Sequence, residues 1–266
     1  MNVGFIGTGT ITEAVVTGLC GAGSPDLSIR LSPRSLDRSR RLSERHAAVE
    51  VASDNQQVLD RSELVFLAVR PQDAGAILSA INFRRDLKVV SFIATMSSAE
   101  IRRQVRPAEF LGRVAPVPPV ARRNGPIAMC PPNRELAGFL DPIGTVIEVS
   151  DEAQLDAFFS ASALMAPYFE LLESVSAWLR GQGVDAAQAD RYTGSLFRGI
   201  AERSTQPTGQ GFAELVDEHA TRAGINEQLR RELIASGFYD RIQAGLDLIQ
   251  ARMQGRATLH DTLHFE

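Results

Sequence analysis

The sequence is poor in the residues that mark several classes of protein. It has only two cysteines, Cys20 and Cys130, and no C-x-x-C pair, so neither a disulfide framework nor a metal site is expected. No apolar run approaches the roughly 20 residues that a membrane-spanning helix needs. The net charge of -4 gives no general attraction to polyanions. We therefore expect no nucleic-acid partner, no membrane partner, and two cysteines that serve as packing residues.

Length and composition fit a globular protein of two domains. The 266 residues can form two cores of ordinary size, and 44% hydrophobic with 23% charged residues is typical of globular chains. The apolar stretch at residues 2–6 is too short, and too soon interrupted by glycine, to be the apolar region of a secretory leader. We expect a cytoplasmic location.

Two kinds of pattern divide the chain near residue 150. Strand-like apolar runs alternate with stretches of helical length at 3–6, 27–31, 64–69, 89–93, 110–114, 127–129 and 145–149. Such alternation predicts a mainly parallel sheet with helices on both faces. After residue 150 the strand signal stops, and helical patterns cover 152–182, 186–203, 212–219 and 226–253. The sequence therefore predicts an α/β domain over 1–150 and an all-helical domain over 151–266.

The helical half also favours self-association. Val175, Trp178 and Leu179 fall in the expected helix over 152–182, a length of roughly 30 residues that one small domain rarely buries alone. A homodimer or higher homo-oligomer would cover its apolar side. An ordinary core helix is the alternative interpretation.

The first fourteen residues carry the most informative motif. A buried strand runs into a glycine turn, where Gly7 permits the bend and Gly9 lets backbone approach a pyrophosphate. The following helix points its N-terminus at the phosphates. The third glycine of the G-x-G-x-x-G pattern is replaced by Thr12, so a turn that binds nothing stays an alternative. The predicted dinucleotide contacts in this turn are Gly7, Thr8, Gly9, Thr10 and Ile11.

The end of the second strand indicates which dinucleotide binds. No carboxylate is present there to accept the ribose 2′-hydroxyl of NADH, whereas Ser32, Arg34 and Ser35 suit the 2′-phosphate of NADPH. We therefore expect NADPH, with NADH less favoured. A basic solvated face on the next helix is the alternative for the arginines beyond Ser35.

Further contacts are predicted where other strands reach the same edge, since ligands of open parallel sheets lie at the carboxyl ends of the strands. The expected contacts are Ala68, Val69, Arg70 and Pro71 after one strand, and Ala94 after the next. A simple strand-ending turn accounts equally well for Pro71.

Together these segments resemble the pyrroline-5-carboxylate reductases. The resemblance rests on residues 4–9 (GFIGTG), 67–72 (LAVRPQ), 113–116 (RVAP) and the helical second half, in the same order and spacing. It implies an N-terminal Rossmann domain that binds NAD(P)H and a C-terminal helical domain that dimerises and forms the substrate site. The implied reaction is hydride transfer to the C=N carbon of a cyclic imino acid, producing proline.

The substrate half departs from the family pattern. Val117 stands where the family has a polar residue, and Ser162 is retained as the equivalent of a serine at the start of the long helix. In the loop that grips the substrate carboxylate, the resemblance retains Thr221 and Gly224 and assigns Asn226 to a threonine that bonds or protonates the imine nitrogen. Asn226 is also a natural helix N-cap.

Two ionisable residues are new in this loop. His219 could serve as the general acid, and Arg222 could bind the carboxylate beside the backbone of Ala223 and Gly224. Both side chains could equally be solvated. With Asn226 and Thr221, His219 completes the predicted catalytic set.

The sequence thus predicts an NADPH-dependent reductase that transfers hydride to the C=N or C=O carbon of a small carboxylated imine. One alternative is a 3-hydroxyacid dehydrogenase, which would need a helix-borne catalytic lysine, whereas the only lysine here is Lys88, just before a strand. The other is a non-catalytic NADPH-binding sensor, which Val117 and the altered loop motivate.

Overall fold

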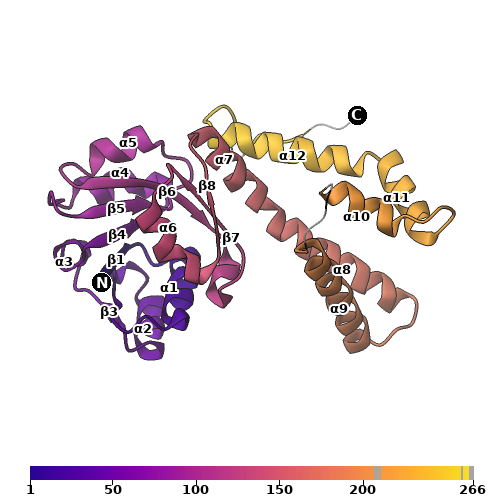
Figure 1. The fold of residues 1–266 in the computed structure, drawn as a ribbon, viewed down its shortest axis with the longest axis horizontal. Helices are drawn as coiled ribbons and strands as arrows, with labels where there is room; N and C mark the ends of the chain where they lie inside the picture. Colours follow the sequence, from indigo (N-terminus) through magenta and orange to yellow (C-terminus); the bar gives the residue numbers. More distant parts are fainter. Residues whose placement is uncertain (207–208, 210, 259, 264–266) are drawn as a thin grey trace. The chain divides into compact units, whose positions relative to one another are not determined.

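The computed structural model describes residues 1–206, 209, 211–258 and 260–263, and they form two compact units (Figure 1). The first unit is Met1–Ser160 together with Gln250–Thr258. The second is Ala161–Ile249 with the described residues after Thr258.

The first unit is built on an eight-stranded sheet of order β3-β2-β1-β4-β5-β6-β7-β8. The strands are β1 (Asn2–Ile6), β2 (Ser28–Leu31), β3 (Val49–Val51), β4 (Leu64–Leu67), β5 (Lys88–Ser91), β6 (Glu109–Pro116), β7 (Pro126–Cys130) and β8 (Thr145–Glu148). All neighbours run parallel except β6 and β7, which are antiparallel. The expected α/β architecture with a mainly parallel sheet is confirmed. The expectation missed β3, whose three residues are too few to give a pattern of alternation.

Helices cover both faces of this sheet. They are α1 (Thr10–Ala22), α2 (Leu36–Arg45), α3 (Asn55–Asp60), α4 (Pro71–Ser79), α5 (Ser98–Gln104), α6 (Arg134–Leu140) and α7 (Glu152–Ala161). Buried residues of α1, α2 and α6 form one core cluster, and those of α3, α4 and α5 form another.

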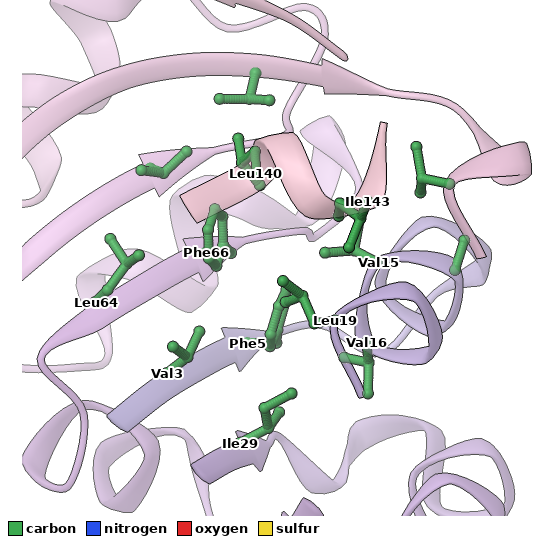
Figure 2. Packing of buried hydrophobic residues seen from close by; sticks show 14 of the residues in the cluster. Val3, Phe5, Val15, Val16, Leu19, Ile29, Leu64, Phe66, Leu140 and Ile143 are labelled. Atoms are coloured by element: carbon green, nitrogen blue, oxygen red, sulfur yellow. The ribbon is translucent and has the colours of Figure 1, made fainter. Parts of the chain in front are cut away.

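Strand side chains alternate between the two clusters. Val3 and Phe5 of β1 pack in the first cluster with Phe66 of β4 (Figure 2), whereas Ile6 and Leu67 pack in the second. The Phe5 and Phe66 rings stack with centroids 5.0 Å apart. Burial on both faces explains why these strands read as continuous apolar runs. The parallel pairing of Ile6 with Leu67 places the carboxyl ends of β1 and β4 side by side.

The second unit is helical, as expected, but two of its predicted helices are broken. Its helices are α8 (Met165–Gly181), α9 (Ala186–Ser204), α10 (Phe212–His219), α11 (Ile225–Ala235) and α12 (Phe238–Met253). The last four residues of α12, from Gln250 on, belong to the first unit. The pattern over 152–182 is divided by a 3-10 turn at Ser162–Leu164, and that over 226–253 is interrupted at Gly237 (φ 70). Glycine in the left-handed region is a common helix terminator.

Much of the apolar surface of this unit is exposed. Exposed fractions reach 63% for Trp178, 71% for Phe212 and 84% for Ile225. Among the described residues, no helix is both long enough and apolar enough to cross a bilayer. An apolar surface of this kind is typical of a protein interface.

Candidate functional site

The glycine turn after β1 is sterically specified. Gly7 has a φ of 98, and a Cβ built on it would lie 2.5 Å from the carbonyl oxygen of Ala68. The backbone N–H of Gly7 donates to Ser32 Oγ at 2.8 Å. The close contact between the first turn and the end of β4 therefore requires glycine.

Two threonines hold the turn in place. Thr12 Oγ1 donates to the carbonyl oxygen of Gly7 at 2.7 Å, and Thr8 Oγ1 donates to the carbonyl oxygen of Ser32 at 3.1 Å. Thr12 is fully buried. The replacement of the third glycine therefore adds a hydrogen bond within the turn and leaves the turn geometry intact.

The start of α1 faces a cavity. Gly9 is the N-cap residue of α1, and a Cβ on it would meet nothing within 4 Å. The first N–H groups of an α-helix have no partners within the helix, so this end attracts anions. The cavity has a volume of about 300 Å³ and is lined by Gly7, Thr8, Gly9, Arg34, Ser35, Ala68, Val69 and Arg70.

These lining residues follow β1, β2 and β4, where β1 lies between the other two strands. The cavity thus occupies the carboxyl edge of the sheet at the point where the strand order reverses, the usual position of a nucleotide in such folds. All eight lining residues were predicted cofactor contacts.

The other five predicted cofactor contacts lie elsewhere. Thr10 and Ile11 open α1, and Pro71 is the first residue of α4. Ser32 is fully buried and its hydroxyl accepts the Gly7 N–H, so its role is to support the turn; the expected direct contact with a 2′-phosphate is corrected on this point.

Ala94 lines a separate cavity of about 510 Å³ beside a buried arginine. Arg113 is 2% exposed, donates to the Ala94 carbonyl oxygen, and pairs with Glu152 at 2.7 Å and Asp156 at 2.9 Å. Burial alone would raise the pKa of Glu152, but hydrogen bonds from Arg113 and Ser98 bring it below its usual value. Burial raises the pKa of Asp156 despite the same arginine. Arg113 thereby connects the loop after β5 to helix α7.

Two arginines beside the first cavity share one carboxylate. Arg34 Nη2 lies 3.0 Å and Arg70 Nε 2.9 Å from Asp73 Oδ2. Hydrogen bonding from Arg70, with the charge of Arg34, lowers the pKa of Asp73, so the carboxylate is ionised at neutral pH. Asp73 was not among the predicted site residues.

Arg34 also lines an adjoining cavity of about 530 Å³ with Pro33, Ser53, Asp54, Asn55, Asp73, Ala76 and Ile77. Residues 53–55 follow β3 and were not predicted either. A correct assignment of β3 would have placed them at the same sheet edge.

The predicted catalytic loop lies between α10 and α11. His219 is exposed, with Nδ1 2.8 Å from the Leu215 carbonyl oxygen, and Asn226 Nδ2 donates to the carbonyl oxygen of His219 at 3.1 Å. Gly224 is the N-cap of α11, so the alternative role of Asn226 as an N-cap is wrong. A Cβ on Gly224 would approach Thr221 Oγ1 to 2.6 Å, which explains the small residue at this bend.

A cavity of about 440 Å³ brings some of these residues together. It is lined by Ile200, Arg203, Ser204, Phe212, Leu215, Val216, His219, Ala220, Asn226, Arg230 and Tyr239. The predicted residues Thr221, Arg222, Ala223, Gly224 and Ser162 do not line it. The arginines of this cavity, Arg203 and Arg230, were missed because they lie on helices outside the loop motif.

Comparisons with known proteins agree with this architecture. Residues 2–97 match the family model described as NADP oxidoreductase coenzyme F420-dependent. Pyrroline-5-carboxylate reductase of Corynebacterium melassecola is 29% identical over 263 residues, with 92% of this chain and 96% of that protein covered. The Haemophilus influenzae pyrroline-5-carboxylate reductase is 24% identical over 268 residues, which cover 97% of this chain and 98% of that protein. The chain resembles the pyrroline-5-carboxylate reductases.

Solved structures show the same fold. The Streptococcus pyogenes 1-pyrroline-5-carboxylate reductase has a TM-score of 0.81 at 19% identity, covering 96% of this chain and 98% of that one. The Plasmodium falciparum pyrroline carboxylate reductase with NADP bound also scores 0.81, at 16% identity, covering 97% of this chain and 98% of that one. The resemblance and fold class expected from the sequence are confirmed.

Two residues, Val117 and Lys88, bear on the choice between the functions expected from the sequence. Val117, directly after β6, is half-buried, and its side chain offers no hydrogen bond at the position where the sequence resemblance led us to expect a polar residue. Lys88 opens β5, at the opposite edge of the sheet from the glycine turn, and pairs with Glu135 at 2.6 Å. Lys88 therefore does not lie beside the nucleotide, so the catalytic lysine that a 3-hydroxyacid dehydrogenase would need is not provided by this residue.

Proposed function

We propose that this protein is an NADPH-dependent reductase that transfers hydride to the C=N or C=O carbon of a small carboxylated imine. The observation that carries the proposal is a resemblance to pyrroline-5-carboxylate reductases over almost the whole chain. It coincides with a glycine turn whose cavity meets the chemical needs of a dinucleotide.

The residues around the glycine turn are chemically suited to bind NADPH. The open N-terminus of α1 beyond Gly9 suits the pyrophosphate, because its unpaired N–H groups and the helix dipole favour negative charge. Arg34, Ser35 and Arg70 offer guanidinium and hydroxyl donors for a 2′-phosphate. When bound, NADPH supplies the hydride. The chain's own residues hold and orient it.

The proposed substrate groups lie in the helical unit. Phe212, Leu215 and Val216 give the 440 Å³ cavity an apolar wall, and Arg230 supplies positive charge for a carboxylate. Arg203 lines the same cavity but already pairs with Glu218 at 2.8 Å. The amide of Asn226 can donate a hydrogen bond to an imine nitrogen.

His219 is the proposed proton source, because it lines the cavity and an imidazole side chain can act as a general acid. In the adjoining loop, Thr221, Arg222 and the backbone of Ala223 and Gly224 form a second candidate for the carboxylate contact, and Ser162 remains a predicted substrate contact.

Turnover tests the proposal directly. Purified protein is mixed with NADPH and pyrroline-5-carboxylate while absorbance of the nicotinamide band is followed, with NADH as the comparison cofactor. NADPH oxidation faster than NADH oxidation is expected. Binding of NADPH without oxidation across a panel of cyclic imino acids would favour the sensor alternative and overturn the reductase.

A pair of arginine variants separates the two candidate carboxylate sites. Arg230 lines the cavity, whereas Arg222 is exposed in the loop and does not. We expect Arg230→Ala to raise the KM for the imino acid about tenfold, the usual order for loss of a charged contact. The KM of Arg222→Ala should stay close to that of the wild-type protein. The reverse order would assign the carboxylate to the loop.

We also propose that a second copy of this chain covers the exposed apolar residues of α8 to α11, giving the expected homo-oligomer. Light scattering on the purified protein measures the mass. A monomer at micromolar concentration would contradict this.

A further inference from the structure

The triad of Arg34, Asp73 and Arg70 sits at the boundary of two cavities. Arg34 and Arg70 both line the 300 Å³ cavity next to the glycine turn, whereas Asp73 lines only the adjoining 530 Å³ cavity. The carboxylate therefore contacts both arginines without lining the cavity at the glycine turn. It takes up no part of that cavity's lining, which stays open to a ligand.

Both arginines keep most of their hydrogen-bonding capacity. Asp73 Oδ2 accepts from Nη2 of Arg34 and from Nε of Arg70, and a guanidinium carries five N–H donors in a fixed plane. Four donors on each arginine are left by these two bonds. The triad has a net charge of +1, so it still attracts a phosphate dianion.

Without the carboxylate, the two arginines would not share this position. Both side chains are substantially exposed, at 49% for Arg34 and 69% for Arg70, so their rotamers are otherwise held only weakly. Two like charges that converge on one oxygen would also repel each other once that oxygen is gone. Asp73 itself is 25% exposed and belongs to the first turn of α4, where the helix dipole favours a carboxylate.

We infer that Asp73 is a positioning residue that sets the preference for NADPH over NADH, by holding Arg34 and Arg70 together for the 2′-phosphate. The inference rests on the proposed cofactor site. NADH lacks the 2′-phosphate and gains nothing from two aligned arginines, so the effect of Asp73 falls on NADPH alone.

The experiment measures dissociation constants by calorimetry for NADPH and NADH, with 2′,5′-ADP and 5′-AMP as fragments that report the same difference without catalysis. For Asp73→Ala we expect NADPH and 2′,5′-ADP to bind about tenfold more weakly, a typical cost for losing charge-assisted hydrogen bonds, with NADH and 5′-AMP changed less than about twofold. Asp73→Glu, which keeps the charge, should recover part of the loss.

Two controls separate positioning from a general structural effect. Asp86→Ala removes a carboxylate that pairs with Arg84 at 3.1 Å, at the opposite edge of the sheet, and should leave all four constants unchanged. In an Arg34→Ala/Arg70→Ala background, adding Asp73→Ala should have no further effect, because the groups it positions are gone.

Three outcomes in Asp73→Ala would overturn the inference: unchanged binding of both cofactors, equal weakening of both cofactors, or tighter NADPH binding. Tighter binding would show that Asp73 competes with the phosphate. If wild-type protein binds neither NADPH nor 2′,5′-ADP, the proposed cofactor site itself fails, which is a different result.

Discussion

Replacement of Gly7 by alanine tests the turn on which the cofactor site depends. The added Cβ would stand 2.5 Å from the Ala68 carbonyl oxygen and 2.8 Å from the Ala68 carbonyl carbon, both of them backbone atoms that cannot rotate away. The φ of 98 adds strain, since an L-residue in such a region costs about 1–3 kcal/mol. We expect Gly7→Ala to destabilise the protein by at least about 2 kcal/mol.

For a chain of this size, that loss corresponds to a fall in Tm of about 4–8 °C, measured by thermal unfolding monitored with circular dichroism. NADPH affinity should fall together with stability, because the turn must move away from β4 and the Gly7 N–H bond to Ser32 lengthens. Titration of the variant with NADPH, followed by nicotinamide fluorescence, measures the second effect.

Two glycines of the same segment provide matched controls. Gly9 has a φ of -88 and space around it, so Gly9→Ala should keep the fold stable while its methyl group intrudes on the phosphate path and weakens NADPH binding. Gly21 lies in α1 with nothing within 4 Å, and Gly21→Ala should stabilise the helix by about 0.5–1 kcal/mol without changing NADPH affinity. If Gly7→Ala behaved like Gly21→Ala, the steric account of the turn would be refuted.

Three further predictions follow from single contacts. Ser32→Ala leaves the buried Gly7 N–H without its acceptor and should cost about 1–3 kcal/mol in chemical denaturation, with a smaller loss if water enters. Glu100→Gln keeps a side-chain oxygen in the capping box with Ser97 but removes the negative charge that strengthens its hydrogen bonds. Hydrogen bonds from Ser97 lower the pKa of Glu100 below its ordinary 4.5, so the contribution of the charge is full above about pH 5 and lost as pH falls through the lowered value. Denaturation at pH 7 and pH 3 should therefore show a difference of about 1 kcal/mol between Glu100→Gln and wild type only at pH 7. Trp178→Ser, at a 63% exposed position, should shift the sedimentation profile toward smaller species without lowering NADPH affinity.

The cofactor half could be predicted because its determinants are local. Gly7 and Gly9 lie two residues apart at a strand end, and steric requirements on such a turn appear directly in the sequence. Arg34 and Arg70 were found by the same logic, as residues that follow strands β2 and β4. Eight predicted residues consequently line one cavity.

Asp73 was not predicted from the sequence because its role depends on Arg34, which is 39 residues away in the chain. Taken locally, an aspartate in the first turn of a helix is an ordinary complement to the helix dipole. Only the folded sheet brings the loop after β2 next to α4. Ser32 shows the opposite case: its position predicted a ligand contact, while the fold directs the hydroxyl at the Gly7 N–H.

The helical half depends on a different kind of determinant. Phe212 and Val216 line the proposed substrate cavity with 71% and 40% of their surface exposed, so the apolar wall of the cavity is also part of the unit's apolar surface. Exposure of apolar surface to water is unfavourable by about 25 cal/mol for each Å². Burial of this surface against a second copy of the chain would therefore favour association. The same residues would then contribute to both substrate binding and association. A periodic pattern predicts which side of a helix is apolar but not what packs against it. In the proposed oligomer, the shape of the substrate cavity would therefore depend on the partner copy, whereas the dinucleotide turn is held within one chain by Ser32 and the end of β4.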